Sequence, residues 1–151
     1  MQTTKIIIVY TSIHHGNTEK VAQAMALSLN ADITKTDHVT PEMLRTYDLI
    51  GFGSGIYFGR HHKQLFKLID QLPLVSAKKA FIFSTSGQGK TSLHKKLNVE
   101  LVKKGFEVIG SFACKGYDTF GPLKLFGGIA KGRPNEEDLQ KARTFAENLR
   151  I

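Results

Sequence analysis

The residues best suited to chemistry in this sequence follow its first apolar run. They are Thr11, Ser12, Ile13, His14, His15, Gly16, Asn17 and Thr18. Small hydroxyl residues and a glycine, placed where a strand leads into a helix, form a cradle of hydroxyl and backbone N–H groups that suits phosphate. The segment contains no lysine and no G-x-G-x-x-G dinucleotide pattern. We therefore expect it to bind a monophosphate.

Short strands and helices alternate along the chain and must position this loop. Apolar runs predict strands over 5–10, 31–36, 47–53, 79–84 and 106–114. Helical spacing of apolar residues predicts helices over 19–29, 62–72, 91–104 and from 134 onward, and Thr40-Pro41 begins a short one. This alternation predicts an α/β fold, a doubly wound parallel sheet with helices on both faces. Ligands bind at the carboxyl ends of such strands, so the loops after the first, third, fourth and fifth strands are the informative ones.

Length and composition narrow the class of protein. The 151 residues predict one domain, residues 1–151, and 41% hydrophobic residues can fill its core. No apolar run reaches the roughly 18–20 residues of a membrane span, and the first one is too short for a signal peptide. The lone Cys114 excludes an internal disulfide and predicts a protein of the reducing cytoplasm. We interpret Cys114 as a buried, inert thiol, with activation by Lys115 as the alternative.

Thr11-Ser12 followed by Gly16-Asn17-Thr18 resembles the FMN-phosphate loop of flavodoxins. Strand count, loop positions and length are similar to the short-chain form of that family over nearly the whole chain. The resemblance implies a three-layer, flavodoxin-like fold with a five-stranded sheet of order 2-1-3-4-5. It also implies non-covalently bound FMN, whose phosphate Ser12, Asn17, Thr18 and nearby backbone amides would hold.

The middle of this loop departs from the family pattern. Flavodoxins have hydroxyl residues where this chain has Ile13, His14 and His15. The two histidines either bond the phosphate, whose charge would raise their pKa, or lie exposed beside it.

The resemblance also assigns contacts to the flavin ring. They come from Ser54, Gly55, Ile56, Tyr57 and Phe58 after the third strand, and from Thr85, Ser86 and Gly87 after the fourth. Tyr57 is the first candidate for stacking or edge contact and Phe58 the second, unless either simply packs its loop onto the core. The loop after the fourth strand has no aromatic residue, and Tyr117 or Phe120 could substitute.

The function implied by the resemblance is electron transfer between a reductase and an acceptor enzyme. The flavin does the chemistry, so no catalytic side chain and no metal ligand set is assigned. The alternative is an FMN oxidoreductase with its own substrate, because residues 54–62 are similar to a loop of flavodoxin-like protoporphyrinogen oxidases. The substrate carboxylates would suit Arg60, His61, His62 and Lys63, although the segment 84–89 lacks the insertion of those oxidases. A third class is a binding module that has lost FMN.

The charge points to the kind of partner. The chain has 21 Lys and Arg against 13 Asp and Glu, a net charge of +8, with cations clustered in 60–63 and 90–104. Flavodoxins are typically acidic and dock to basic partners, whereas this chain is basic. We therefore expect its partner proteins to be acidic. We also expect a less negative potential for the second reduction of the flavin. Nucleic acid is not expected, because no recognition motif accompanies the charge.

Two other phosphate-handling classes do not fit. Gly89-Lys90-Thr91 is like the end of a P-loop, but Ser84 stands where its first glycine is required. Response regulators share the fold and need acidic residues after the first and third strands. This chain has Tyr10-Thr11-Ser12 and Gly53-Ser54 there.

Overall fold

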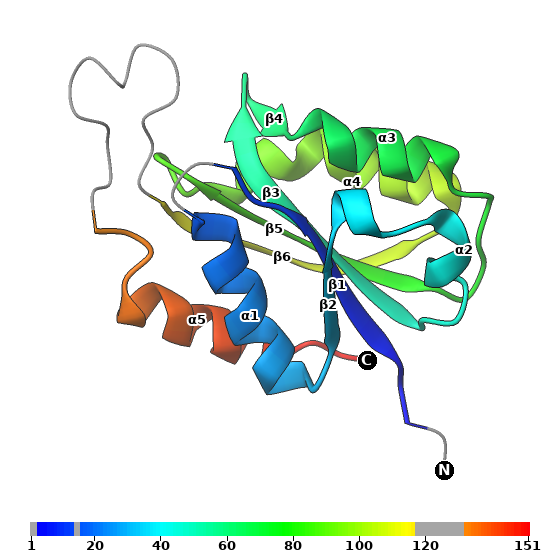
Figure 1. Cartoon of the computed structure of the whole chain (residues 1–151), viewed down its shortest axis with the longest axis horizontal. Coiled ribbons are helices and arrows are strands. Elements are labelled where there is room, and N and C mark those ends of the chain that lie inside the picture. The colour runs from blue at the N-terminus through cyan, green and yellow to red at the C-terminus, as the bar shows by residue number, and fades with distance from the viewer. Residues whose placement is uncertain (1–2, 14–15, 117–131) are drawn as a thin grey trace.

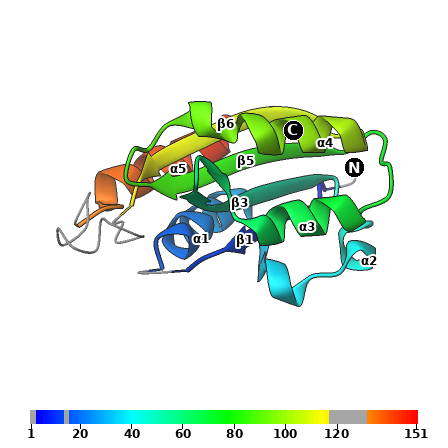
Figure 2. The same ribbon diagram turned by 90° about the horizontal axis from the view of Figure 1, so that it is seen from above.

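The chain folds into one β-sheet covered by helices on both faces (Figure 1). The computed structural model describes residues 3–13, 16–116 and 132–151. The long strands are β1 Ile6–Thr11, β2 Asp32–Lys35, β3 Leu49–Tyr57, β5 Lys79–Ser86 and β6 Glu107–Lys115. They pair in parallel in the order β2-β1-β3-β5-β6, and Figure 2 shows β1, β3, β5 and β6 side by side in that order. The expected doubly wound parallel sheet, with its five strands ordered 2-1-3-4-5, is confirmed.

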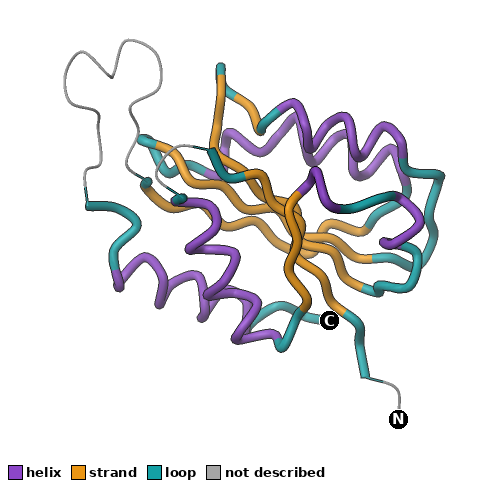
Figure 3. The backbone as a smooth tube through the Cα atoms, in the orientation of Figure 1, coloured by secondary structure: helices purple, strands orange, loops and turns teal. Residues whose placement is uncertain are grey.

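Helices and sheet form three layers (Figure 3). The helices are α1 Asn17–Leu29, α2 Pro41–Leu44, α3 Lys63–Gln71, α4 Lys95–Lys104 and α5 Glu136–Glu147, with the 3₁₀ turns η1 Thr36–His38 and η2 Thr91–His94. Successive β1 residues alternate between two cores, because strand side chains point to opposite faces. Ile7 and Val9 pack under α2, α3 and α4, whereas Ile6 and Ile8 pack under α1 and α5. Each helix in the described ranges is too short or too polar for a membrane span.

Two glycines let β3 and β5 pack closely on the α1 side. Gly51 lies directly opposite Phe81, and Gly53 directly opposite Phe83. Each buried phenyl ring fills the space of the missing side chain, since a Cβ on Gly53 would lie 2.2 Å from Phe83 Cζ. The aromatic rings therefore lie across β3, and the glycines are packing residues of the sheet.

Local signals set several helix ends, and the start of α2 is where the sequence predicts it. The Thr40 hydroxyl caps α2, with Pro41 in its first turn. Gly105 ends α4 in a left-handed conformation, with φ 103°. Asn135 and Asp138 form a reciprocal capping box at the start of α5.

Three boundaries differ from the prediction. Residues 54–57, predicted as loop, continue β3, and β4 Arg60–His61 turns back to pair with its end, which adds a short sixth strand. The turn between them needs positive φ at Phe58, a residue type that gives no turn signal. The predicted helix over 91–104 begins as the 3₁₀ turn η2, and α1 begins at Asn17 rather than at Glu19.

Candidate functional site

The ends of four parallel strands meet at one side of the sheet, here named the carboxyl edge. They are Thr11 of β1, Tyr57 of β3, Ser86 of β5 and Lys115 of β6. Thr11 is paired with Ser54, and Gly55 with Thr85, so the three segments predicted to bind a cofactor lie next to one another. Parallel pairing brings them together, although about 70 residues of sequence separate the first from the last.

The start of α1 offers hydrogen-bond donors to an anion. Its N-cap, Gly16, is left-handed with φ 65° and has no side-chain oxygen for the N–H groups of the first turn. A Cβ built on Gly16 meets no described atom within 4 Å, so the space in front of this helix end is open among the described residues. Ser12 Oγ accepts a hydrogen bond from the Glu19 backbone N–H at 3.3 Å. A hydroxyl and helix N–H groups thus lie together at the positive end of a 13-residue helix.

Asn17 and Thr18, in the first turn of α1, face the interior of the protein. Both are buried, with exposed fractions of 8% and 3%. The Thr18 and Thr85 hydroxyls share a hydrogen bond of 2.9 Å, which joins the first turn of α1 to the end of β5. Asn17 packs against Gly116, where a Cβ would lie 2.8 Å from Asn17 Nδ2.

Thr11 faces the other side of the sheet. Its buried hydroxyl is bonded to the hydroxyl of Thr36 and lies 3.5 Å from Gln64 Oε1 on α3. A cofactor contact at Thr11 therefore stays a prediction that would involve its backbone. Ile13 is 44% exposed. His14 and His15, which were predicted to lie at the phosphate, are outside the described residues.

Ser54 is also used within the protein. It is fully buried, its hydroxyl donates to the Gly55 carbonyl at 2.6 Å, and it accepts from the His62 backbone N–H at 2.9 Å. Ile56 is half-buried and pairs with His61 of β4. The side chain of Ser54 thus fastens the start of α3 to β3.

A two-residue hairpin, here named the 57–60 hairpin, projects from the carboxyl edge. Phe58 and Gly59 have φ values of 53° and 78°, which is a type I′ turn. The Tyr57 ring lies over Gly55 and meets the His62 ring edge-on at 5.2 Å. Phe58 is 89% exposed. Of the two candidate aromatics, Phe58 is the one that extends outward, and Tyr57 packs back onto β3.

The loop after β5 is tightly folded. Thr85 and Ser86 are buried and Gly87 is half-buried. Ser86 Oγ accepts from the Gly89 N–H at 2.9 Å, and the Ser86 carbonyl accepts from Gly116 N at 2.9 Å. Contacts from this loop to a ligand would therefore come from its backbone, and they stay a prediction.

Positive charge surrounds the carboxyl edge. Arg60, Lys63, Lys90 and Lys115 are exposed there, and Lys67 follows one turn along α3. Arg60 lies over the Phe66 ring, 5.4 Å from its centroid. This rim attracts anions and acidic surfaces.

Two buried histidines lie beneath the 57–60 hairpin. His61 and His94 are 1% and 3% exposed. Burial lowers the pKa of His61 to about 3, with a further contribution from His94, and burial lowers the pKa of His94 to about 4. His61 is therefore neutral, which corrects the expectation that it presents charge to a substrate. No motif in the sequence singles out His94, and the burial of His61 is signalled only by the alternation of a short strand after Gly59.

Cys114 is buried, as expected. Burial raises its pKa to about 12, with Asp138 adding to the shift and Arg133 opposing it. The thiol is thus protonated and inert at neutral pH.

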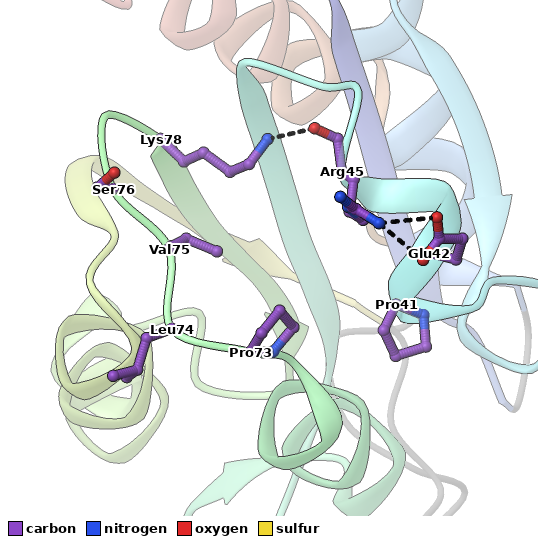
Figure 4. Close-up of a pocket in the computed structure, with 8 residues that line it drawn as sticks. All are labelled: Pro41, Glu42, Arg45, Pro73, Leu74, Val75, Ser76 and Lys78. Carbon is purple, nitrogen blue, oxygen red and sulfur yellow. Dashed lines mark hydrogen bonds and ion pairs between the residues drawn. The ribbon is translucent and has the colours of Figure 1, made fainter.

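A separate hollow of about 500 Å³ lies at the opposite end of the sheet (Figure 4). It is formed by α2 and by the segment that leads into β5, and an Arg45–Glu42 ion pair of 3.0 Å stands at its side. Lys78 closes one wall by donating to the Arg45 carbonyl at 2.8 Å. No residue of the predicted cofactor site lines this hollow.

Comparisons with known proteins agree with this geometry. The model of a family described as a flavodoxin domain matches residues 7–117. An uncharacterized protein of Methanocaldococcus jannaschii is 54% identical over 147 residues, which cover 96% of this chain and 97% of that protein.

Solved structures share the fold at low identity. A flavodoxin from the domain Archaea has a TM-score of 0.69 at 18% identity, with 95% of this chain and 94% of that chain covered. Oxidised flavodoxin 2 from Bacillus cereus has a TM-score of 0.67 at 22% identity, with 95% of each chain covered. These values establish a common backbone arrangement.

Proposed function

Because this chain belongs to the flavodoxin domain family, we propose that it binds FMN without a covalent link at the carboxyl edge. We further propose that it carries electrons between a reductase and an acceptor enzyme. The observation that carries the proposal is the open, glycine-capped start of α1 at the same edge of the sheet as the 57–60 hairpin. The first suits a phosphate and the second supplies an exposed aromatic ring at the same edge.

The residues of the edge fit this cofactor. Ser12 and the N–H groups of the first turn of α1 would hold the phosphate. The hairpin, with Phe58 at its tip, and the backbone of 85–87 would contact the ring system. Bound FMN supplies one- and two-electron transfer, and the chain supplies binding, orientation and exclusion of water.

The basic rim supports an acidic partner protein. Arg60, Lys63, Lys90 and Lys115 are exposed around the place proposed for the cofactor. Opposite charge on a partner steers its approach to the exposed edge of the cofactor, an effect that weakens with salt. One such positive charge about 10 Å from the ring would stabilise the anionic reduced flavin by about 0.4 kcal/mol at the dielectric constant of water.

An oxidoreductase with its own substrate is the second candidate. The exposed Phe58 ring and the neighbouring Arg60 form an apolar and cationic surface that suits an aromatic molecule bearing carboxylates. The short connection from β5 to η2, residues 87–90, favours the electron carrier instead, because it lacks the insertion of the oxidases. Turnover of a small substrate without a partner protein distinguishes the two.

The test is a flavin titration of the purified apoprotein. We expect wild type to bind FMN more tightly than riboflavin, which lacks the phosphate. Ser12→Ala should weaken FMN about tenfold and leave riboflavin unchanged, because one charge-assisted hydrogen bond is lost. Ser111→Ala, an exposed serine of β6, is the matched control. Equal affinity of wild type for FMN and riboflavin, or binding of neither, would overturn the proposal.

A further inference from the structure

The histidines beneath the hairpin are bonded to neighbouring residues of one strand. His61 Nε2 lies 2.9 Å from the Phe83 carbonyl oxygen of β5. His94 Nε2 lies 2.6 Å from the hydroxyl of the fully buried Ser84. The two imidazole rings are tilted by 59°, with centroids 4.9 Å apart. The pair therefore connects β4 and η2 to the same short stretch of β5.

The protonation of His61 follows from its partner. A carbonyl oxygen only accepts, so His61 Nε2 carries the hydrogen and Nδ1 carries the lone pair. Neither His61 Nδ1 nor His94 Nδ1 has a hydrogen-bond partner among the described residues, and both atoms are buried. No third metal-ligating side chain of the described residues joins them. An apolar pair would avoid the cost of two unsatisfied nitrogens, so stability alone does not account for histidines here.

The bonds of His61 and its neighbours set the position of the hairpin. The Ile56–His61 strand pair closes its base, and His62 N–H donates to Ser54 Oγ. The imidazole of His61 adds a bond to the Phe83 carbonyl oxygen, three residues before the end of β5. The Ile56–His61 pair lies within three residues of Phe58, and the His62–Ser54 bond lies four residues from it on either side, so a change in the imidazole pair would act close to the tip.

We propose that His61 and His94 are positioning residues, which hold the 57–60 hairpin against β5 so that its tip meets the flavin ring at one fixed place. This inference rests on the proposed FMN site and adds the residues that control the hairpin. Directional bonds at adjacent β5 residues specify one position of the hairpin, whereas apolar side chains would allow several packings.

The first experiment measures the hairpin without any cofactor. Amide hydrogen exchange is followed in apoprotein of wild type, His61→Phe, His94→Phe and His61→Gln, with His38→Phe as a matched control at an exposed histidine. We expect the amide of His62, which is bonded to Ser54 Oγ, to exchange at least about tenfold faster in the two phenylalanine variants, while Ile8 in β1 is unchanged. His61→Gln, which keeps an N–H donor, should restore part of the protection.

The second experiment measures the cofactor in the same variants. The midpoint potential of bound FMN should shift in His61→Phe and His94→Phe and stay at the wild-type value in His38→Phe. Unchanged hairpin exchange, or equal acceleration of the Ile8 amide, would show that the pair has no positioning role. An unchanged potential in both phenylalanine variants would likewise overturn the inference. If wild type binds no FMN, the proposed function fails, and the exchange rates still decide whether the pair positions the hairpin.

Discussion

Stability in mild acid provides a quantitative check on the buried histidine pair. His61 and His94 are neutral in the folded protein, with pKa values of about 3 and about 4, because burial disfavours their charged forms. In the unfolded chain both return to the ordinary pKa of about 6.5. Below pH 6.5 the unfolded state therefore binds more protons, and the free energy of unfolding falls as pH falls.

The size of the effect follows from these pKa values. Between pH 8 and pH 5 each imidazole takes up its proton in the unfolded chain and stays neutral in the fold, which costs about 2 kcal/mol per group. The pair together lowers the free energy of unfolding by about 4 kcal/mol. Domains of this size have about 5–15 kcal/mol in total, so the loss is large. Carboxylates contribute little in this range, because their ordinary pKa values lie below it.

The assay is urea unfolding of the apoprotein at several values between pH 8 and pH 5. Through this pair wild type should lose about 4 kcal/mol over this range and His61→Phe about 2 kcal/mol, because one of the two groups of the pair is gone. Burial also lowers the pKa of His62, and that contribution is common to both proteins. The other histidines remain in both proteins, so the difference between the two curves isolates His61. His38→Gln, at an exposed histidine, controls for the removal of any histidine. Parallel curves for wild type and His61→Phe would refute the reasoning.

Three further predictions concern stability and can be measured by the same urea unfolding at pH 7. Gly53→Ala should destabilise by about 1–3 kcal/mol, because its Cβ would lie 2.2 Å from the buried Phe83 ring; a smaller loss would mean that the ring can move. Phe58→Gly should stabilise the apoprotein by about 1 kcal/mol, since it relieves a left-handed φ of 53°, and should weaken flavin binding in a fluorescence titration; tighter binding would exclude Phe58 as a contact. Asn135→Ala should cost about 1 kcal/mol through loss of the capping box with Asp138, and an unchanged midpoint would contradict that role.

Much of the fold could be predicted because its signals are local. The apolar run at 5–10 became β1, since continuous β-branched residues suit a strand covered on both faces. Thr40-Pro41 began α2 and Gly105 ended α4, because capping depends on residues within one turn. The sheet order followed from the family resemblance, and the meeting of the three loops followed from parallel strands.

The location of the candidate site could be predicted from the sequence, but the hydrogen bonds of its side chains could not. Ser12 lies against the start of α1, and its contact with a phosphate, which the resemblance implies, stays a prediction. The hydroxyls of Thr11 and Ser54 are instead bonded within the protein, to Thr36 and to the hairpin base. The Ser54 hydroxyl donates to its neighbour Gly55, but the remaining partners of these two hydroxyls lie 8 to 53 positions away, which no local pattern contains.

The sequence by itself thus determined the five long strands, several helix ends and the edge of the sheet at which the candidate site lies. Only the tertiary structure decided the 57–60 hairpin, the outward ring of Phe58 and the burial of His61 and His94. The physical reason is the range of the interactions. Periodicity and capping act within a few residues, whereas the histidine pair exists because the chain returns to Phe83 and Ser84, 22 and 10 residues away from His61 and His94 respectively.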